Sequence, residues 1–531
     1  MKYLICLIML FSHNCLTAQT WEKTFGLPGR FDKLTNLAEV YDSGFFIAGT
    51  YNYYPNTRGV IIKTDINGNK LYQIDLGTGT GLIQSNQPKH IESTSDGGII
   101  FCGTFDGFGS NDVLVTKLNA CGDVEWCRIF RTDSWPDWGL VIHQLTDGGY
   151  IMLTTQYAGF DPNERAHLFR FDSAGNVLWI QQYLKDQDHP RIKNDFIEDV
   201  IVTASGDYFM TGWAYWLDSV PPGYMRVKST TLLADQNREE EWVSLYRRED
   251  TEEYSGSVNS TQKDNNHFYT GAVYRPPNGD FPMILVYDSL GNLLLDTMPQ
   301  IPNIGNKWAE GYLLHPMFTA DSRLFAQTLM VDSTNRWPGW YSIHELDTLG
   351  GWINTFLHPT AHYSAYSIMT SDEKILAGAL VGSEYDQDII LMKFNTSLQY
   401  DSIYTVPRTY DYLCADSIVS KTIDYSVCEV IVNVEDIPTR DDYYKSIKTI
   451  PIIPTPNPAS DEVRFMLKNT EHHKNISIIC YDIHGRKIDS VPVNSGMNEA
   501  KINVSSWTPG MYVAVVYASG KKVGSCRFIV K

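Results

Sequence analysis

The chain has 531 residues, of which 43% are hydrophobic and 13% aromatic, and this composition excludes a largely disordered protein. A chain of this length is expected to contain at least two domains. Its 62 acidic and 43 basic residues give a net charge of −19, which excludes nucleic-acid binding through a broadly basic surface, because that mode depends on Lys and Arg at phosphates.

Residues 1–18 have the pattern of a secretory signal peptide. Lys2 supplies a positive charge, residues 3–11 form an apolar stretch, and Leu16-Thr17-Ala18 forms a small-residue cleavage site before Gln19. The apolar stretch is too short to cross a bilayer and no later one is long enough, so we expect a mature chain that begins near Gln19 and has no transmembrane segment. Lipidation at Cys15 is a weaker alternative, because the residues before it are not small and apolar.

One pattern repeats seven times between Tyr41 and Ser397: a turn with Asp or Ser, an apolar run, a polar loop and a second apolar run. Successive starts are 54, 51, 58, 59, 57 and 51 residues apart, at Asp42, Asp96, Asp147, Ser205, Asp264, Asp321 and Asp372. Periods of this length are typical of propellers and solenoids. We therefore predict an all-β protein in which residues 19–408 form a seven-bladed β-propeller.

Each repeat has the features of neighbouring strands. Asp-Gly-Gly or a variant forms a turn, and the run after it, such as residues 99–104, is apolar on both faces, as expected for a strand packed between two blades. Glycines near the end of this run suit crowded backbone packing towards a propeller axis; they are Gly49, Gly103, Gly212, Gly271 and Gly378.

Tryptophans recur where the outermost strand of a repeat should begin. They are Trp126, Trp179, Trp242 and Trp352, and Trp21 lies in an equivalent strand before the first complete repeat. We expect residues 21–25 to pair with the blade that contains residues 389–394, because this pairing closes the ring and removes a free sheet edge.

Seven cysteines remain outside the signal peptide, so at least one should lack a partner within the chain. In an oxidising compartment the pairs to test are Cys121 with Cys127, Cys414 with Cys428, and Cys480 with Cys526. Cys102 would then be a buried strand thiol. Spacing alone does not prove these connections, and the lack of a Cys-x-x-Cys pair or a His-rich tract gives little support for a zinc site.

Two patterns resemble known sites but depart from them. Residues 65–69 superficially resemble a calcium loop, but the Gly comes too early and no Glu closes the loop, so a hairpin turn is the better interpretation. Residues 172–179 resemble the Asp-box of sialidase-type propellers with one extra residue on each side of the Gly, so sialidase activity is not inferred. The catalytic residues, if any, are unknown, and we expect no cofactor and no metal.

Aromatic residues gather in two loop regions. Trp213, Tyr215 and Trp216 lie in a long insertion of the fourth repeat, and Trp337 and Trp340 lie in the sixth repeat. These five candidate ligand-binding residues either form stacking platforms for a sugar or peptide, or pack their loops onto the blades, which is the commoner use of aromatic side chains.

After the repeats, residues 409–449 are predicted to connect the propeller to a second domain, residues 450–531. Alternating apolar residues and turns there predict a small Ig-like β-sandwich. Three motifs occur in order: Pro456-Asn457-Pro458; residues 481–486 with Asp482, Gly485 and Arg486; and Pro509-Gly510-Met511-Tyr512, followed by the terminal Lys531. Together they resemble the C-terminal sorting domain of the type IX secretion system of Bacteroidetes.

This resemblance implies how the protein is delivered. Such domains take a folded cargo from the periplasm across the outer membrane, and they are often removed while the cargo is released or attached to surface lipopolysaccharide. We therefore expect the type IX secretion machinery as a partner and a secreted or outer-membrane surface location. Four Asp-Ser/Thr-apolar triplets are similar to the O-glycosylation sequon of the same phylum, but they also suit turns; they begin at Asp288, Asp347, Asp401 and Asp416.

Two functions remain open. The preferred hypothesis is a non-catalytic propeller that binds a glycan, peptide or protein. The alternative is a hydrolase acting on polysaccharide, in which acidic residues from different blades converge on the central channel. The fold does not choose between them, because propellers host both; paired carboxylates in the channel would favour the enzyme, and an aromatic or neutral rim would favour binding.

Overall fold

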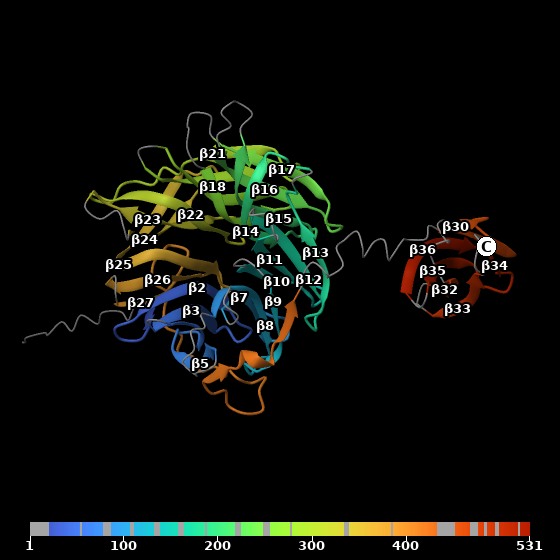
Figure 1. Cartoon of the computed structure of the whole chain (residues 1–531), viewed down its shortest axis with the longest axis horizontal. Helices are drawn as coiled ribbons and strands as arrows, with labels where there is room; N and C mark the ends of the chain where they lie inside the picture. The colour runs from blue at the N-terminus through green and yellow to red at the C-terminus, as the bar shows by residue number, and fades with distance from the viewer. Residues whose placement is uncertain are drawn as a thin grey trace, which may run out of the picture. The chain divides into compact units, whose positions relative to one another are not determined.

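The computed structural model of the chain contains two compact units, residues 1–437 and 438–531, which are described separately (Figure 1). The predicted signal peptide lies outside the described part. The structure describes residues 21–53, 56–77, 86–106, 111–131, 138–157, 164–185, 188–217, 225–247, 255–276, 279–333, 339–383, 386–432, 452–467, 476–482, 486–493, 499–518 and 521–531.

The described residues of the first unit form seven four-stranded blades around a common axis (Figure 1). Blade 1 contains β2 (Phe31–Glu39), β3 (Phe45–Tyr53), β4 (Asn56–Thr64) and β5 (Lys70–Leu76). Blade 2 contains β6 (Gln87–Ser93), β7 (Ile99–Phe105), β8 (Asp112–Leu118) and β9 (Val124–Arg131). Blade 3 contains β10 (Trp138–Gln144), β11 (Tyr150–Tyr157), β12 (Glu164–Phe171) and β13 (Val177–Gln182).

The remaining blades follow the same order from the innermost strand outwards. Blade 4 contains β14 (Ile192–Val202), β15 (Tyr208–Leu217), β16 (Met225–Ala234) and β17 (Glu240–Tyr246). Blade 5 contains β18 (Ser255–Asp264), β19 (His267–Tyr274), β20 (Phe281–Tyr287) and β21 (Leu293–Thr297). Blade 6 contains β22 (Trp308–Phe318), β23 (Leu324–Val331), β24 (Trp340–Leu346) and the first part of β25 (Trp352–Met369). The second part of β25 begins blade 7 and pairs with β26 (Ile375–Ser383), which pairs with β27 (Asp386–Phe394).

The N-terminal strand β1 (Glu22–Phe25) completes blade 7. It pairs antiparallel with β27, with Glu22 opposite Met392 and Phe25 opposite Ile389. The predicted ring closure is therefore confirmed, as is the seven-bladed β-propeller.

The turns between the third and fourth strands are held by an Asp or Asn side chain. In blade 1, Asp65 Oδ1 accepts hydrogen bonds from the backbone N–H groups of Asn67 and Asn69, both at 2.8 Å. This geometry confirms the hairpin-turn interpretation of residues 65–69. In blade 3 the turn residue Gly175 has a φ of +78°, and a Cβ atom added to it would lie 2.5 Å from the Trp126 ring of blade 2. Glycine therefore serves both the turn and the contact between blades.

Tryptophans of the outermost strands donate hydrogen bonds to the turn of the next blade. Trp126 Nε1 donates to the Ser173 carbonyl at 3.3 Å, and Trp242 Nε1 donates to the Ser289 carbonyl at 3.1 Å. Trp21 makes the same contact across the closure, from blade 7 to the Ile66 carbonyl of blade 1 at 3.2 Å.

The innermost strand of every blade contains a register shift of the kind produced by a β-bulge. Glycines on neighbouring second strands make room for these crowded backbones. A Cβ atom on Gly103 would lie 1.9 Å from the Gln87 carbonyl oxygen, and one on Gly212 would lie 2.1 Å from the Phe196 carbonyl oxygen. The crowding predicted for these glycines is present.

Residues 409–432, which we call the strap, cross the outer edges of blades 1 and 2. β28 (Lys421–Ile423) pairs parallel with β5, and β29 (Glu429–Val432) pairs parallel with β9, with the 3₁₀ turn η1 (Tyr425–Val427) between them. Residues 409–449 were expected to connect two domains, but the strap belongs to the propeller unit. It covers backbone edges that would otherwise be unpaired.

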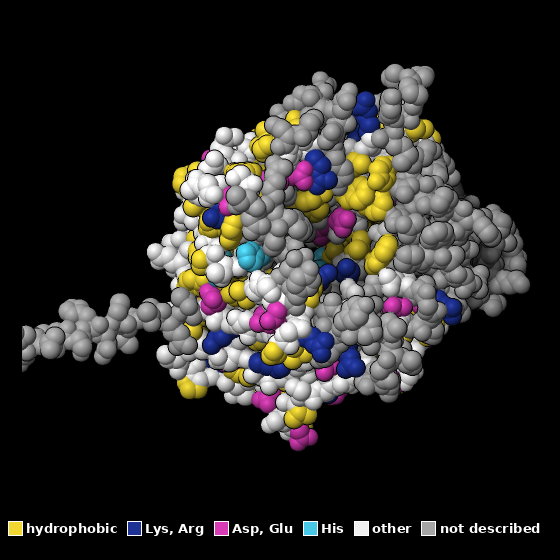
Figure 2. Space-filling model, turned by 60° about the vertical axis from the view of Figure 1, so that its left-hand side comes forward, with side chains coloured by type: hydrophobic (Ala, Val, Ile, Leu, Met, Phe, Trp, Pro, Cys, Tyr) yellow, Lys and Arg dark blue, Asp and Glu magenta, His cyan; other side chains and the backbone are white. Residues whose placement is uncertain are grey.

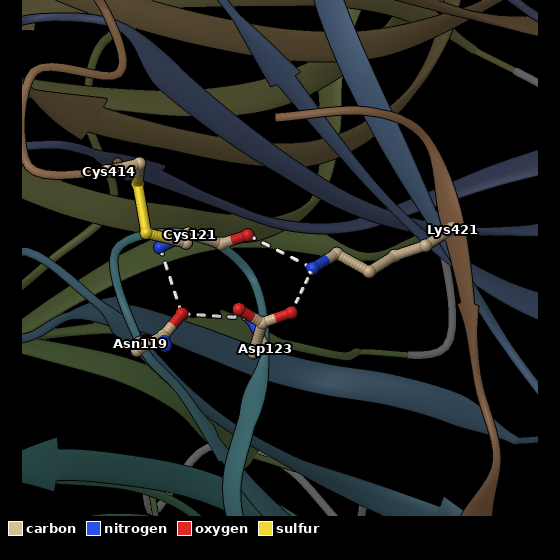
Figure 3. The surroundings of a disulfide bond; sticks show 5 residues. All are labelled: Asn119, Cys121, Asp123, Cys414 and Lys421. Carbon is tan, nitrogen blue, oxygen red and sulfur yellow. Dashed lines mark hydrogen bonds and ion pairs between the residues drawn. A yellow bond between two sulfur atoms is a disulfide. The ribbon is translucent and has the colours of Figure 1, made fainter. Parts of the chain in front are cut away.

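Two disulfides fix the strap to blade 2. They are Cys121–Cys414 and Cys127–Cys428, with Cα separations of 5.6 and 4.9 Å. Figure 3 shows Lys421 beside the first disulfide, where its Nζ atom lies 2.5 Å from Asp123 Oδ1 and donates to the Cys121 carbonyl at 3.1 Å.

The predicted pairs Cys121–Cys127 and Cys414–Cys428 are therefore wrong. Cys121 lies in the turn before β9, whereas Cys127 lies inside that strand. The strand from Val124 to Cys127 alone spans about 10 Å, which exceeds the Cα separation that a disulfide allows. Cys102 is buried and unpaired, which confirms its predicted state.

The second unit is a small two-sheet β-sandwich. One sheet contains β30 (Ile452–Thr455), β31 (Glu462–Leu467) and β34 (Glu499–Asn503). The other contains β33 (Lys487–Val493), β32 (Ile476–Asp482), β35 (Gly510–Ala518) and β36 (Lys521–Val530). Val463, Phe465 and Leu467 point into the core, where Phe465 packs against Phe528, so the predicted sandwich is confirmed.

The predicted pair Cys480–Cys526 is also wrong, because both thiols are free. Each cysteine lies opposite Ala514, Cys480 on β32 and Cys526 on β36, with β35 between them. Two strand spacings of about 4.8 Å separate their backbones, which is too far for a disulfide.

Candidate functional site

Titratable side chains gather where the innermost strands bulge. The strand register skips Lys89 in blade 2 and Glu198 in blade 4, which are therefore the extra residues of the two bulges, and His90 and Asp199 follow them directly. Bulges re-aim side chains and are frequent beside functional sites. We call the following group the axial cluster: Lys89, His90, Glu92, His143, Glu198, Asp199, His315 and Tyr366. Figure 2 shows a hollow on one face of the molecule in which acidic, basic and His side chains are visible among hydrophobic ones.

Glu92 and His143 of the cluster form an ion pair. His143 Nδ1 donates to Glu92 Oε2 at 2.5 Å, and His143 Nε2 donates to the Val200 carbonyl at 2.9 Å. Burial disfavours the imidazolium, but the negative charge and hydrogen bond of Glu92 outweigh it and raise the pKa of His143 to about 8. Because both ring nitrogens face acceptors, the charged imidazolium fits this position.

A second histidine nearby has the opposite character. Burial, reinforced by the positive charges of His143 and His315, holds the pKa of His90 well below its usual value. The His90 and His143 rings are 5.2 Å apart, and the neutral Nδ1 of His90 accepts from the Ile142 backbone N–H at 3.4 Å. The cluster therefore holds one charged and one neutral imidazole side by side.

Asp199 is bound to the next blade. Its Oδ2 atom accepts hydrogen bonds from the backbone N–H of Ser260 at 2.7 Å and from the Ser260 hydroxyl at 2.9 Å. Burial raises the pKa of Asp199 although these hydrogen bonds and His143 oppose the shift. Burial also raises the pKa of Tyr366, whose ring lies 4.0 Å from that of His315.

These contacts connect successive blades rather than leaving reactive groups free. Glu92 of blade 2 holds His143 of blade 3, His143 reaches Val200 of blade 4, and Asp199 of blade 4 holds Ser260 of blade 5. The second oxygen of Glu92 accepts from the Gln144 backbone N–H at 2.9 Å. Among the described residues, no group of three or more His, Cys, Asp or Glu side chains is arranged to hold a metal ion.

The predicted aromatic residues of blade 4 lie on β15 and are half-buried. Trp213 stacks on Phe196 with ring centroids 3.9 Å apart, and Tyr215 meets Trp213 edge-on at 5.6 Å. Trp216 has Lys228 Nζ 4.5 Å and the Arg191 guanidinium 5.7 Å from its ring centroid. These rings therefore have partners within the blade, and a role in ligand stacking stays a prediction.

The aromatic residues of the sixth repeat are only partly within the described residues. Trp340 begins β24, and Lys307 Nζ lies 4.2 Å from its ring centroid. Trp337 lies outside the described residues. The blade 4 and blade 6 aromatic residues thus belong to different blades, and in both a lysine covers a Trp ring.

The sorting motifs of the second unit hold its final strand. Asn457 Oδ1 accepts from the Ile529 backbone N–H at 2.8 Å, and the backbone N–H of Lys531 donates to the Ala459 carbonyl at 2.8 Å. Pro456 and Pro458 flank Asn457 in this segment. The first motif therefore docks the C-terminus onto the sandwich.

The other two motifs stabilise turns. Asp482 Oδ1 accepts from the Arg486 backbone N–H at 2.9 Å, and the Arg486 guanidinium lies 3.1 Å from Asp482 Oδ2. Pro509-Gly510 opens β35, where the Tyr512 hydroxyl donates to the Thr508 carbonyl at 2.7 Å. Gly485 lies outside the described residues.

Residues 455–531 match the family described as "Secretion system C-terminal sorting domain". The second unit is a sorting domain. It indicates that the protein is secreted or attached to the cell surface, and it implies handling by the type IX secretion machinery. In the described part of the chain, no helix has the length and apolar character needed to cross a membrane.

The solved structures to which the chain is similar include the following three. A protein of unknown function from Bacteroides caccae is 9% identical, with a TM-score of 0.29, over 61% of this chain and 81% of that one. The WD40 domain of Toxoplasma gondii coronin is 8% identical, with a TM-score of 0.42, over 71% and 87%. A glycoside hydrolase family 32 protein from Bifidobacterium adolescentis is 9% identical, with a TM-score of 0.31, over 96% and 95%. These similarities carry no argument about function, and no curated protein is detectably similar to the chain.

Two of the Asp-Ser/Thr-apolar triplets form the third turns of their blades. Asp288 Oδ1 accepts from the Leu290 backbone N–H at 2.9 Å, and Asp347 Oδ1 accepts from the Leu349 backbone N–H at 2.8 Å. Leu290 is 76% exposed and Leu349 is 71% exposed. The role in turns is confirmed for these two, and glycosylation stays a prediction.

The sequence interpretation missed the axial cluster, because its members share no motif. One signal was available: Glu92 and His143 each stand four residues before a turn aspartate, Asp96 and Asp147 respectively. Opposite charges at the same position of successive blades indicate a contact between those blades.

Proposed function

We propose that this secreted or surface-attached protein is a non-catalytic binding protein whose propeller takes a glycan, peptide or protein ligand. The observation that supports this most is the engagement of the axial carboxylates. Both oxygens of Glu92 and one oxygen of Asp199 accept hydrogen bonds from neighbouring blades. A general acid or base must instead exchange a proton with the substrate at hydrogen-bond distance.

The half-buried aromatic residues supply a surface for the ligand under this proposal. Trp216 and Trp340 each lie beside a lysine, so their surroundings combine apolar area with a positive charge. Trp side chains are enriched among the residues that supply most of the contact energy at binding interfaces. Residues 1–18 would serve as the signal peptide, and N-terminal sequencing of exported protein should begin near Gln19.

The experiment is retention of the chain from Gln19 to Lys531 on immobilised polysaccharides, peptides and surface proteins. Retention is expected on at least one class, and Trp216→Ala should weaken it about 10-fold or more if the aromatic surface carries the contact. Tyr246→Ala, on the outermost strand of the same blade, serves as the control. Lack of retention on every class would contradict the proposal.

The second candidate is a polysaccharide hydrolase, because the charges of Glu92 and Asp199 both act on His143 near the propeller axis. Two nearby carboxyl groups are the usual requirement for glycoside hydrolysis. Release of reducing sugar that disappears in both Glu92→Gln and Asp199→Asn would favour this candidate.

A further inference from the structure

A cavity lies between blades 7 and 1, where the N-terminal strand closes the ring. It has a volume of about 370 Å³, and its lining includes residues 23–27 together with Asn69, Lys70 and Gln73 of blade 1. Lys23 alternates along β1 with the buried Trp21 and Phe25, so its side chain lies on the face of β1 that meets blade 1. A Cβ atom added to Gly68 would lie 2.8 Å from Lys23 Cγ, which places Lys23 over the third turn of blade 1.

The same place between blades 2 and 3 is filled by the strap. Arg128 corresponds to Lys23, because it also stands two residues after a tryptophan that donates to the third turn of the next blade. Glu429 of the strap is in register with Arg128, and its Oε2 atom lies 3.0 Å from Arg128 Nε. The cation of the outer strand therefore has a carboxylate partner there.

The strap also contributes an apolar side chain to this place. Ile431, two residues after Glu429, is in register with Phe130 of β9. It packs against the core between blades 2 and 3, as do Val177 and Ile180 of β13. An acidic residue and an aliphatic one, two positions apart on one added strand, therefore complete the contact.

Between blades 7 and 1 these partners are lacking in the described part of the chain. Lys70 and Gln73 of β5 take the positions of the two aliphatic residues of β13. Lys70 Nζ donates to Gln73 Oε1 at 2.6 Å, and no described carboxylate forms an ion pair with Lys23 or Lys70. The cavity therefore combines two positively charged side chains with the ring of Phe25.

We infer that this cavity binds an extended acidic segment of another protein, which lies along β1 as the strap lies along β9. A Glu or Asp side chain of the segment meets Lys23 and Lys70, and an aliphatic side chain two residues further on enters the cavity beside Phe25. This inference rests on the proposed binding function and names its ligand class.

A polypeptide fits this place better than an acidic saccharide. Among the strands that the structure describes, β1 pairs with β27 alone, so its outer edge has backbone groups for one more strand. Main-chain hydrogen bonds at a sheet edge supply affinity, and pockets for alternate side chains supply specificity. A saccharide could meet the lysines but has no main chain to pair with β1.

The test is isothermal titration calorimetry with the chain from Gln19 to Lys531. The probe is a capped peptide that copies residues 426–433, with serine in place of Cys428, because its Glu429 and Ile431 have the required spacing. The expected result is saturable binding that weakens at higher salt. The Glu429→Gln peptide should bind at least about 10-fold more weakly, since hydrogen bonds to charged groups are among the stronger ones.

Matched variants of the chain locate the contact. Lys23→Met should weaken binding of the Glu429 peptide about 10-fold or more, and it should bind the Glu429→Gln peptide as the unchanged chain does. Lys23→Arg copies Arg128 and should retain most of the binding. Lys522→Met makes the same change in net charge on β36 of the sorting domain and should leave binding unchanged. Thermal unfolding of each variant checks that it is folded.

Several outcomes would overturn the inference. No binding of the Glu429 peptide, or unchanged binding by folded Lys23→Met, would each do so. Sedimentation that shows a dimer of the chain, lost in Lys23→Met, would identify a second copy as the occupant and would also overturn it. So would binding of an oligogalacturonate, lost in Lys23→Met, without binding of the peptide.

The retention experiment separates this inference from the proposed function. If the peptide fails but a glycan or a surface protein is retained, the inference falls and the proposed function stands. No retention of any class, together with no binding of the peptide, would remove both.

Discussion

Blades 1 and 2 differ from blades 4 and 5 at one buried position, the next-to-last residue of the third strand. In blades 1 and 2 this residue is Lys63 or Lys117, and each forms an ion pair with the aspartate of the first turn, Asp42 or Asp96. Blades 4 and 5 have Leu233 and Val286 at this position, both at most 3% exposed. The same place in the fold is thus filled either by a paired charge or by a hydrocarbon side chain.

The other blades show which feature is essential. Blades 3 and 7 use Arg170 with Asp147 and Lys393 with Asp372. Blade 6 reverses the charges, with Glu345 on the strand and Arg323 beside the turn. The side chain at this position is therefore buried in every blade. Where it is charged, it has a partner of opposite charge, and either sign can stand on the strand.

The largest expected loss of stability comes from breaking one of these buried ion pairs. Asp42→Ala leaves Lys63 buried without its acid and should lower the free energy of unfolding by about 3–5 kcal/mol. The double change Asp42→Ser with Lys63→Leu copies blade 4, which has Ser205 and Leu233, and should lie within about 1 kcal/mol of the natural protein. Denaturant unfolding measures both, and a double variant as unstable as Asp42→Ala would contradict the comparison.

The next effect concerns the strap, which covers blades 1 and 2. Replacing Cys127 and Cys428 with serine should lower the free energy of unfolding by about 2–5 kcal/mol, because a long loop is no longer closed. Mass spectrometry of unreduced peptides should recover Cys121 linked to Cys414 and Cys127 linked to Cys428. Peptides that join Cys121 to Cys127 would show the connectivity to be wrong.

His143 connects the two groups of blades, and its pKa predicts a pH dependence. Its folded pKa of about 8 lies above the unfolded value of roughly 6.5, so the stabilisation is complete below pH 6.5 and is lost as the pH rises through 8. The expected loss is about 1–2 kcal/mol. His90 acts below this window, because its pKa is lowered. Unfolding at pH 6 and pH 9 should differ less in His143→Gln, and an equal difference in both proteins would refute this account.

The smallest expected effects concern a feature that both groups share. Trp126→Phe and Trp242→Phe each remove the hydrogen bond to the next blade and should cost about 1 kcal/mol. Trp352 is 42% exposed and donates to Thr355 of its own strand, so Trp352→Phe should cost less. Thermal unfolding ranks the three variants. An equal loss for Trp352→Phe would argue against a stabilising role of the hydrogen bonds between blades.

The sequence predicted the blades because each blade is specified locally. The Asp-Gly turns, the run apolar on both faces and the outer-strand tryptophan all lie within one repeat, and Trp21 marks the closing strand. The residue at the buried position, which is Lys, Arg, Leu, Val or Glu in different blades, can also be found in the sequence, two residues before the Asp or Asn of the third turn.

The disulfides and the axial cluster are different, because they depend on contacts between distant segments. Cys121 meets Cys414 across 293 residues, and only the strap brings them together. His143 meets Glu92 because bulged strands of two blades lie side by side. Neither the bulges nor the path of the strap has a local sequence pattern. Sequence spacing therefore predicted the wrong cysteine pairs, and it did not predict that His143 lies beside Glu92.

The central claim is that the axial carboxylates hold blades together and do not catalyse. The most direct test incubates the chain from Gln19 to Lys531 with a polysaccharide that it retains, and measures new reducing ends over a day beside the Glu92→Gln and Asp199→Asn variants. The account predicts retention without release by the natural protein, and lower stability in the Glu92→Gln variant. Release by the natural protein that is lost in both folded variants would contradict it.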